Sequence, residues 1–336
     1  MNLVYLENAR ESISQELMNA LSEDIRACEE EMQNRLRSPI ETVEKVGLHI
    51  SAAGGKRLRP ALVSLSARGV GKPFDRRRVH RLGACMEMIH MATLIHDDVV
   101  DEATLRRGKP TPSALWGNTA SVLSGDVLLA KAMEILAEDG DLEIIRTVSR
   151  TVVEMAEGEV AEIEARGDFD LSKETHYSIL KQKTASFMGC CCLLGGLVAS
   201  AEKRAIDSLS EYGENLGMAF QIMDDLLDYL GDDSRTGKPR ATDFREGCAT
   251  LPLIFLRKQL DANESNKLRA FFGNGISENT IHEITTIMKE NGVFSECYEE
   301  AKSFTEKALS AIQDLPKSDA KDALETLAQF VIAREV

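Results

Sequence analysis

The chain has 336 residues, 43% of them hydrophobic, which is enough for one large buried core. It carries 55 Asp and Glu against 40 Lys and Arg, and the resulting net charge of -15 argues against a nucleic-acid-binding surface. An anionic substrate would therefore need locally gathered Arg and Lys, or cations recruited by carboxylates. The sequence has no apolar run long enough to span a membrane and no secretory signal at its start, so we expect a cytoplasmic protein without a transmembrane anchor.

Apolar residues recur at helical spacing along most of the chain, and strand signals are sparse. A helix is expected to start at Ser38, with Pro39 in its first position and Glu41 three residues past the cap. One example of this apolar periodicity is the segment 122–136. Helix ends are expected where Gly, Pro, Asn and Asp gather, at 69–73, 166–170, 231–239, 273–275 and 291–292. We therefore predict an all-α fold with one domain over residues 1–336.

Two basic segments stand out in this acidic chain, GGKRLRP at 54–60 and LRRGK at 105–109. Arg offers a planar fork that matches phosphate oxygens, and Lys offers a compact charge, so both segments suit the capture of a diphosphate. A single basic turn is more often only a solvated surface.

Two acidic motifs lie within apolar helical segments, HDDVVD at 96–101 and FQIMDDLLD at 220–228. In each motif two Asp residues four positions apart share a helix face, and their repulsion requires solvent exposure or a bound cation. Hard carboxylate ligands favour Mg²⁺. One such motif could be merely an acidic helix face, but two copies accompanied by basic segments favour a metal-diphosphate site. The fold would have to bring the two motifs together.

Seven cysteines include the run 190–192, but they form neither a CxxC pair nor a disulfide-framework spacing. We expect reduced thiols that pack between helices. His90, which precedes the first acidic motif, and His96, the first residue of that motif, would by themselves be interpreted as structural residues.

These motifs together resemble those of the trans-prenyltransferase, or polyprenyl diphosphate synthase, family of the isoprenoid synthase type I class. The resemblance extends from 54–60 through 96–101, 106–108, 183–184 and 220–228 to GKP at 237–239 and TLP at 250–252. It therefore covers about residues 50–255, the expected active-site core. It implies a helical bundle around a deep central cavity, a homodimer, and about three Mg²⁺ ions per active site.

The resemblance also implies roles for individual residues. Isopentenyl diphosphate would be bound by Lys56, Arg59, His90 and Arg107. The allylic diphosphate, or its reacting end, would be contacted by Arg106, Lys183, Thr184, Gln221 and Lys238. Magnesium would be bound directly by Asp97, Asp101 and Asp224, and directly or through water by Asp98, Asp225 and Asp228. Asp243 would support the metal ligands without binding the ion itself, and His96 stays structural.

The sequence departs from the family pattern at Ala241, where Gly is usual, and at Cys248, where short-chain members usually carry a phosphate-binding Lys. Ala92 and Thr93, one helical turn before Asp97, are both small, so the growing chain would have room beneath the first acidic motif. We expect a trans-polyprenyl diphosphate of about twenty carbons or more, made by a transferase for isoprenoid biosynthesis. Two alternatives remain open, a terpene cyclase of similar fold and a non-catalytic partner subunit of another synthase.

Overall fold

The computed structural model describes residues 14–231 and 240–333, and nearly all of this part is helical. The described residues form two compact units. The first unit comprises residues 14–148, 191–210 and 314–326, and the second comprises 149–190, 211–231, 240–313 and 327–333. The all-α prediction is confirmed, whereas the prediction of a single domain stays a prediction.

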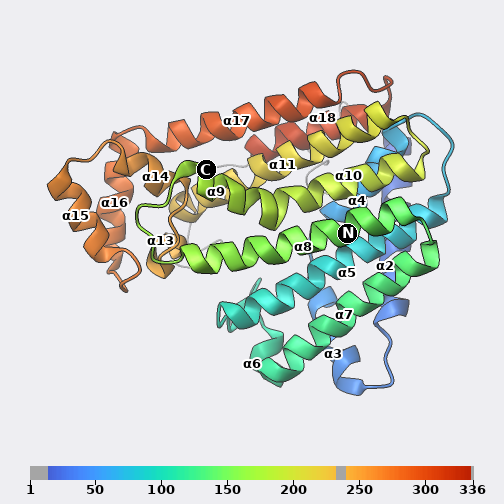
Figure 1. Ribbon diagram of the computed structural model, residues 1–336, viewed down its shortest axis with the longest axis horizontal. Coiled ribbons are helices and arrows are strands. Elements are labelled where there is room, and N and C mark those ends of the chain that lie inside the picture. Colours follow the sequence, from blue (N-terminus) through green and yellow to red (C-terminus); the bar gives the residue numbers. More distant parts are fainter. Residues whose placement is uncertain (1–13, 232–239, 334–336) are drawn as a thin grey trace. The chain divides into compact units, whose positions relative to one another are not determined.

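The first unit is built on a long helix that carries the first acidic motif at its end. This helix, α5 (Arg76–Val100), packs against α2 (Gln15–Leu36), α4 (Leu58–Gly69) and α7 (Asn118–Asp139), and α5 and α7 lie side by side in Figure 1. Smaller elements complete this part of the unit: α3 (Glu41–Ala52), β1 (Leu105–Arg106), β2 (Lys109–Pro110) and α6 (Pro112–Trp116). Because α5 has neighbours on several sides, about half of its residues are buried.

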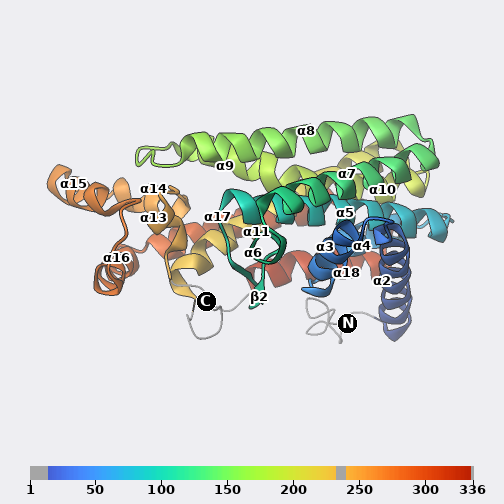
Figure 2. The same ribbon diagram turned by 90° about the horizontal axis from the view of Figure 1, so that it is seen from below.

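The second unit carries the second acidic motif and several short helices. Figure 2 shows α14 (Leu251–Arg257), α15 (Ala262–Phe271) and α16 (Glu278–Glu290) near one another, and α14 and α16 pack against α17 (Val293–Ala311). The unit also contains α9 (Lys173–Leu180), the π-helical turn η1 (Lys181–Ala185) and α13 (Thr242–Glu246). Four further helices contribute residues to both units: α8 (Leu142–Ala165), α10 (Ser186–Val198), α11 (Lys203–Leu230) and α18 (Asp319–Ile332).

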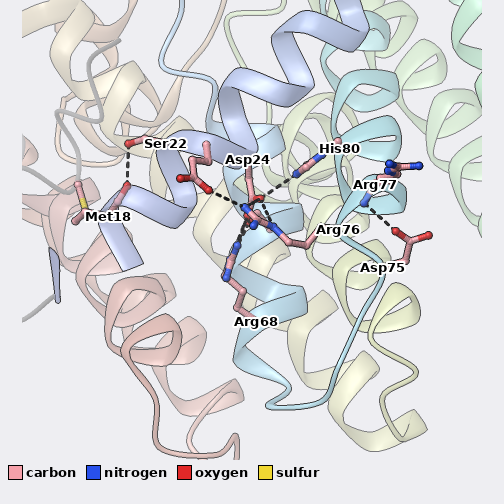
Figure 3. Close-up of polar contacts among 10 residues, drawn as sticks. Met18, Ser22, Asp24, Arg68, Asp75, Arg76, Arg77 and His80 are labelled. Carbon is pink, nitrogen blue, oxygen red and sulfur yellow. Dashed lines mark hydrogen bonds and ion pairs between the residues drawn. The ribbon is translucent and has the colours of Figure 1, made fainter. Parts of the chain in front are cut away.

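A buried carboxylate connects three helices of the first unit (Figure 3). Asp24 on α2 accepts hydrogen bonds from Ser64 Oγ and Arg68 Nη2 on α4, at 2.6 and 2.5 Å. It also accepts from Arg76 Nη2 at 2.7 Å and lies 2.9 Å from His80 Nε2, both on α5. Burial would raise the pKa of Asp24, but these four partners hold it well below its usual range. Asp24 is therefore ionised at neutral pH and holds α2, α4 and α5 together.

The expected helix ends agree with the structure, but the expected start at Ser38 does not. Helices α4, α8, α11, α15 and α16 all end at or within one or two residues of the predicted breaks. Helix α3 begins at Glu41 with Ile40 as its N-cap, and no side chain caps it. The Ser38 hydroxyl instead accepts a hydrogen bond from the Ile40 N–H, so it is used in the turn before the helix.

The cysteines have the packing role expected from the sequence. All seven are free thiols, and only Cys248 is not fully buried. Burial raises the pKa of the Cys190 thiol to about 12, so this thiol is protonated and unreactive at neutral pH. Among the described helices, none combines the length and hydrophobicity needed to cross a bilayer.

Candidate active site

The two basic segments meet in the first unit. Segment 105–110 is a two-stranded hairpin whose turn residues, Arg107 and Gly108, both have positive φ, as a type I′ turn requires. The Arg107 guanidinium donates to the Gly54 carbonyl, and Lys109 Nζ donates to the Ala52 carbonyl at 2.7 Å. The hairpin is thereby attached to the turn between α3 and α4, which carries Lys56.

Arg59 and His90 belong to the same cationic region. Arg59 lies in the first turn of α4, and His90 lies nearly three turns before the end of α5. Burial lowers the pKa of His90 well below its usual value, and the nearby charges of Arg59, Arg107, Arg106 and Arg57 lower it further. His90 is therefore neutral at pH 7 and can donate a hydrogen bond without adding a charge. The structure thus groups Arg59, His90 and Arg107, with Lys56 exposed on the adjacent turn.

The first acidic motif occupies the end of α5. Asp97 is half-buried in the last turn, Asp98 is buried, and Asp101 is exposed at the C-cap, where its N–H donates to the Asp97 carbonyl at 2.8 Å. Asp98 Oδ1 accepts a hydrogen bond from Arg106 Nε at 2.7 Å. A carboxylate that we expected to bind metal is therefore paired here with an Arg that we expected to bind the allylic diphosphate.

The second acidic motif lines a pocket of about 220 Å³ within the second unit. Asp224, Asp225 and Asp228 reach it from α11, and Asp243 reaches it from α13. The rest of the lining comprises Glu162, Ala165, Arg166, Leu171, His176, Ile179, Leu180, Lys183, Gln221, Cys248, Ala249 and Thr250. Six described residues of this unit were assigned to catalysis or to the second metal cluster, and five of them, all except Thr184, line this cavity. They share it with further polar groups that the sequence did not reveal.

A π-helical turn presents Lys183 and Thr184. Lys183 Nζ pairs with Glu159 at 3.0 Å and with Glu162, both on α8. Thr184 Oγ1 donates to Gln221 Oε1 at 3.3 Å. The turn approaches α8 closely at Gly158, where a Cβ atom would lie 2.8 Å from the Lys183 backbone nitrogen. Such single π turns often occur at functional positions.

Two of the pocket aspartates have partners that fix their orientation. Asp225 and His176 are both buried, with His176 Nε2 3.0 Å from Asp225 Oδ2. Asp228 accepts from the backbone N–H groups of Thr242 and Asp243, at 3.2 and 3.1 Å, so it holds the start of α13. The sequence could not show these partners, because they lie about fifteen to fifty residues away along the chain.

The pKa of Asp243 responds to the excess of negative charge in this pocket. Burial raises its pKa well above the usual range, and the charges of Asp228 and Asp225 raise it further. Such a set of oxygen ligands fits Mg²⁺, whose charge would offset the repulsion among the carboxylates. Among the described side chains, no group of three or more His, Cys, Asp and Glu is already arranged as a metal site. The diphosphate and water would have to supply the remaining ligands.

Two expectations stay predictions. The acidic motifs belong to different units, so their sharing of metal ions is not established by the geometry within either unit. Lys238 and the expected lid at 232–239 lie outside the described residues.

Comparison with known proteins identifies the family. Residues 40–290 match the family model described as polyprenyl synthetase. The chain is 34% identical over 318 residues to "Heptaprenyl diphosphate synthase component 2" of Geobacillus stearothermophilus, covering 94% of this chain and 97% of the relative. It is 34% identical over 301 residues to the octaprenyl diphosphate synthase of Escherichia coli strain K12, covering 90% and 93% of the two chains.

Solved structures agree with these sequence matches. The decaprenyl diphosphate synthase of Rhodobacter capsulatus has a TM-score of 0.89 and 33% identity, covering 95% of this chain and 98% of its own. A polyprenyl synthase of Caulobacter crescentus, described as complexed with calcium and isoprenyl diphosphate, has a TM-score of 0.89 and 34% identity, covering 97% and 100%. The chain described above therefore belongs to the polyprenyl synthetase family.

Proposed function

We propose that this chain is a prenyltransferase that condenses isopentenyl diphosphate with an allylic diphosphate to give a trans-polyprenyl diphosphate. The observation that carries the proposal is the cationic cluster of Arg59, Arg107 and neutral His90, which suits a diphosphate bound without metal. The carboxylate pocket of the second unit suits a second diphosphate bound through metal. Two kinds of diphosphate site fit a condensation better than a one-substrate reaction.

The carboxylates would bind Mg²⁺ in the roles expected from the sequence. Asp97, Asp101 and Asp224 would be direct ligands, and Asp98, Asp225 and Asp228 would act directly or through water. When bound, Mg²⁺ neutralises the diphosphate and makes it a better leaving group. The number of ions, about three per active site, also belongs to this proposal.

The remaining polar residues would orient the allylic substrate and steady its charge. Lys183, Arg106 and Lys238 would hold the allylic diphosphate, so that the C–O bond breaks and pyrophosphate leaves. The Thr184 hydroxyl and the Gln221 amide are weak nucleophiles, so their dipoles can face the allylic cation without trapping it. The double bond of isopentenyl diphosphate then forms the new C–C bond, and one proton is lost to the departing pyrophosphate.

We propose a product of about twenty carbons or more, because Ala92 and Thr93 leave space one helical turn before Asp97. Relatives at 32–33% identity include a geranylgeranyl diphosphate synthase and an all-trans-nonaprenyl-diphosphate synthase, and the products in both names fall within this range.

We propose that the chain works as a homodimer in the cytoplasm. Val153, Val160 and Ile163 on α8 have exposed fractions of 55%, 54% and 42% and lie on one helix face, where a second copy could cover them. A heptaprenyl relative is named "component 2", so activity of the purified chain alone must be measured. Light scattering gives the oligomeric state, and activity only after addition of a second protein would contradict the proposal.

Product analysis tests the reaction itself. The purified chain is incubated with Mg²⁺ and an allylic diphosphate, with and without isopentenyl diphosphate. We expect a longer diphosphate only when both substrates are present. Hydrocarbon formed without isopentenyl diphosphate would instead indicate a terpene cyclase, and no product in either mixture would favour a non-catalytic subunit.

A further inference from the structure

The turn before α4 contains an arginine of the basic segment 54–60, Arg57, to which the proposed mechanism assigns no individual role. Arg57 has φ of 49°, a left-handed conformation that non-glycine residues rarely adopt. Its side chain is only 9% exposed, although both neighbouring residues, Lys56 and Leu58, are less buried. A buried, charged residue in a strained conformation requires compensating contacts.

Those contacts come from three separate segments. Arg57 Nη1 donates to Glu87 Oε1 on α5 at 2.8 Å, and the Glu87 side chain is only 7% exposed. Arg57 Nε donates to Glu29 Oε1 on α2 at 2.9 Å, and Nη2 donates to the Ser51 carbonyl at the end of α3 at 3.0 Å. One guanidinium therefore fixes the turn relative to α2, α3 and α5.

The same contacts reach the cationic cluster. Glu87 is one helical turn before His90 on α5, so the two residues share a helix face. The charge of Glu87 also acts on Arg59 and Arg107. On the turn itself, a Cβ atom at Gly55 would lie 3.1 Å from Arg107 Nη1 and 3.4 Å from Arg57 Nη1. Arg57 and Arg107 thus approach each other across Gly55, with Glu87 as a carboxylate close to both.

We infer that Arg57 and Glu87 form a positioning pair, which holds Lys56, Arg59 and Arg107 in the arrangement that binds isopentenyl diphosphate. This inference rests on the proposed function of that cluster. The pair acts through geometry, because Glu87 by its charge alone would weaken the binding of an anion. If Glu87 acts by positioning, neutralising it weakens the binding of isopentenyl diphosphate. If it acts by charge alone, neutralising it strengthens that binding.

The experiment measures steady-state kinetics of Glu87→Gln and Arg57→Lys. Glu87→Gln keeps the shape of the side chain, and Arg57→Lys keeps the charge but loses the fork. We expect each variant to raise the KM for isopentenyl diphosphate about tenfold, as expected for one lost charge-assisted hydrogen bond, with the KM for the allylic diphosphate within about twofold of wild type. Arg57→Gly, which relieves the left-handed strain, should not restore the KM.

The matched control is Arg78→Lys in the same unit. Arg78 makes a two-pronged ion pair with buried Asp139, with both distances 2.7 Å. Loss of this two-pronged pair in Arg78→Lys should lower the melting temperature without changing the KM for either substrate. A KM for isopentenyl diphosphate that falls in Glu87→Gln, or stays at the wild-type value in both variants, would overturn the inference. So would an equal rise in both KM values.

Binding measurements separate this inference from the proposed function. If the wild-type chain does not condense the two substrates, the proposed function fails. Calorimetric titration of inorganic pyrophosphate into wild type and Glu87→Gln still measures the cluster, and positioning predicts about tenfold weaker binding in the variant. Equal or tighter binding would contradict it. This comparison of wild type with Glu87→Gln does not depend on Arg57→Lys, so it can be made even if Arg57→Lys does not fold.

Discussion

At the scale of single residues, Gly158 determines how closely the π turn approaches α8. A Cβ atom there would lie 2.7 Å from Gln182 Cβ and 2.8 Å from the Lys183 backbone nitrogen. Gly158→Ala should therefore shift Lys183 and Thr184 and lower kcat about tenfold or more, although Ala is the better helix former. The measurement is kcat and the KM for the allylic diphosphate.

Gly195→Ala is the control for Gly158→Ala. A Cβ atom at Gly195 would lie 2.4 Å from the Val63 carbonyl oxygen in the first unit, and neither residue lines the pocket of the second unit. This variant should lose about 1–3 kcal/mol of stability through overpacking while keeping the kinetic constants of the folded fraction. Equal kinetic losses in both variants would mean that close packing in general, and not the π turn, limits turnover.

Ala92 carries the residue-scale prediction about product length. Ala92 is 2% exposed on α5, about one turn before Asp97. Ala92→Phe should shorten the product because the ring would project into the space where the chain grows, whereas Ala92→Ser, which stays small, should not. Chromatography of the dephosphorylated products checks this. An unchanged distribution in Ala92→Phe would refute the tunnel beneath the first acidic motif.

Sequence reasoning identified residues that belong to a recognisable motif, but it did not identify their partners. Lys183 and Thr184 were found as a motif, whereas Glu159 and Glu162, which hold Lys183, lie on a different helix and have no motif of their own. His176 was missed for the same reason. Such a Glu or His gains its role only from the residue that the fold places next to it.

At the scale of elements, the Asp24 network joins α2 to α4 and α5. Asp24 is 1% exposed, so Asp24→Asn would leave Arg68 and Arg76 without their shared carboxylate in a poorly solvated place. Because both arginines keep some exposure, we expect a loss of about 3 kcal/mol in the free energy of unfolding, near the lower limit for broken buried pairs. Urea denaturation measures this loss.

Asp207→Asn is the surface control for Asp24→Asn. Asp207 pairs with Lys203 one turn earlier on α11, and both side chains are more than half exposed. Such a pair contributes only about 0–1 kcal/mol, so this variant should unfold almost as wild type does. A similar loss of unfolding free energy in both variants would show that the Asp24 network contributes no more to stability than a surface ion pair does.

The same network predicts an acid sensitivity. The pKa of Asp24 in the folded protein lies below the ordinary value of 3.8, so its contribution is fully present above that pH and is lost as the pH falls through the folded pKa. Acid unfolding curves of wild type and Asp24→Asn should therefore begin to converge as the pH falls below about 4, and draw closer as it falls further. Curves that stay parallel to the lowest accessible pH would contradict this assignment.

Helix ends were predictable because Gly and Asn leave a local signature, as at Gly69 and Asn291. The start at Ser38 was not, because a Ser hydroxyl can serve a turn as well as a cap. The hairpin at 105–110 was also missed, since strands of two residues have no periodicity. The π turn at Lys181–Ala185 likewise leaves no sequence pattern.

At the scale of the whole molecule, the sequence predicts that the two acidic motifs converge on shared metal ions. The two motifs lie in different units, so the structure of either unit alone cannot show this convergence. The family comparison over residues 40–290 explains why both motifs occur in one chain, but the shared metal site depends on how the units come together. Metal binding in the presence of inorganic pyrophosphate tests this directly, because shared ions respond to changes in either motif.

Two double variants make the comparison, Asp97→Asn/Asp101→Asn in the first motif and Asp224→Asn/Asp228→Asn in the second. Electron paramagnetic resonance counts the Mn²⁺ ions bound per chain with inorganic pyrophosphate present. If the motifs share ions, either double variant removes more than half of the bound Mn²⁺, and combining them removes little more, because contributions to one site are not additive. Independent sites would instead give partial losses that sum in the combined variant. Since circular dichroism reports whether each variant is folded, a sum of partial losses in folded protein would refute convergence and, with it, the metal-clamped site.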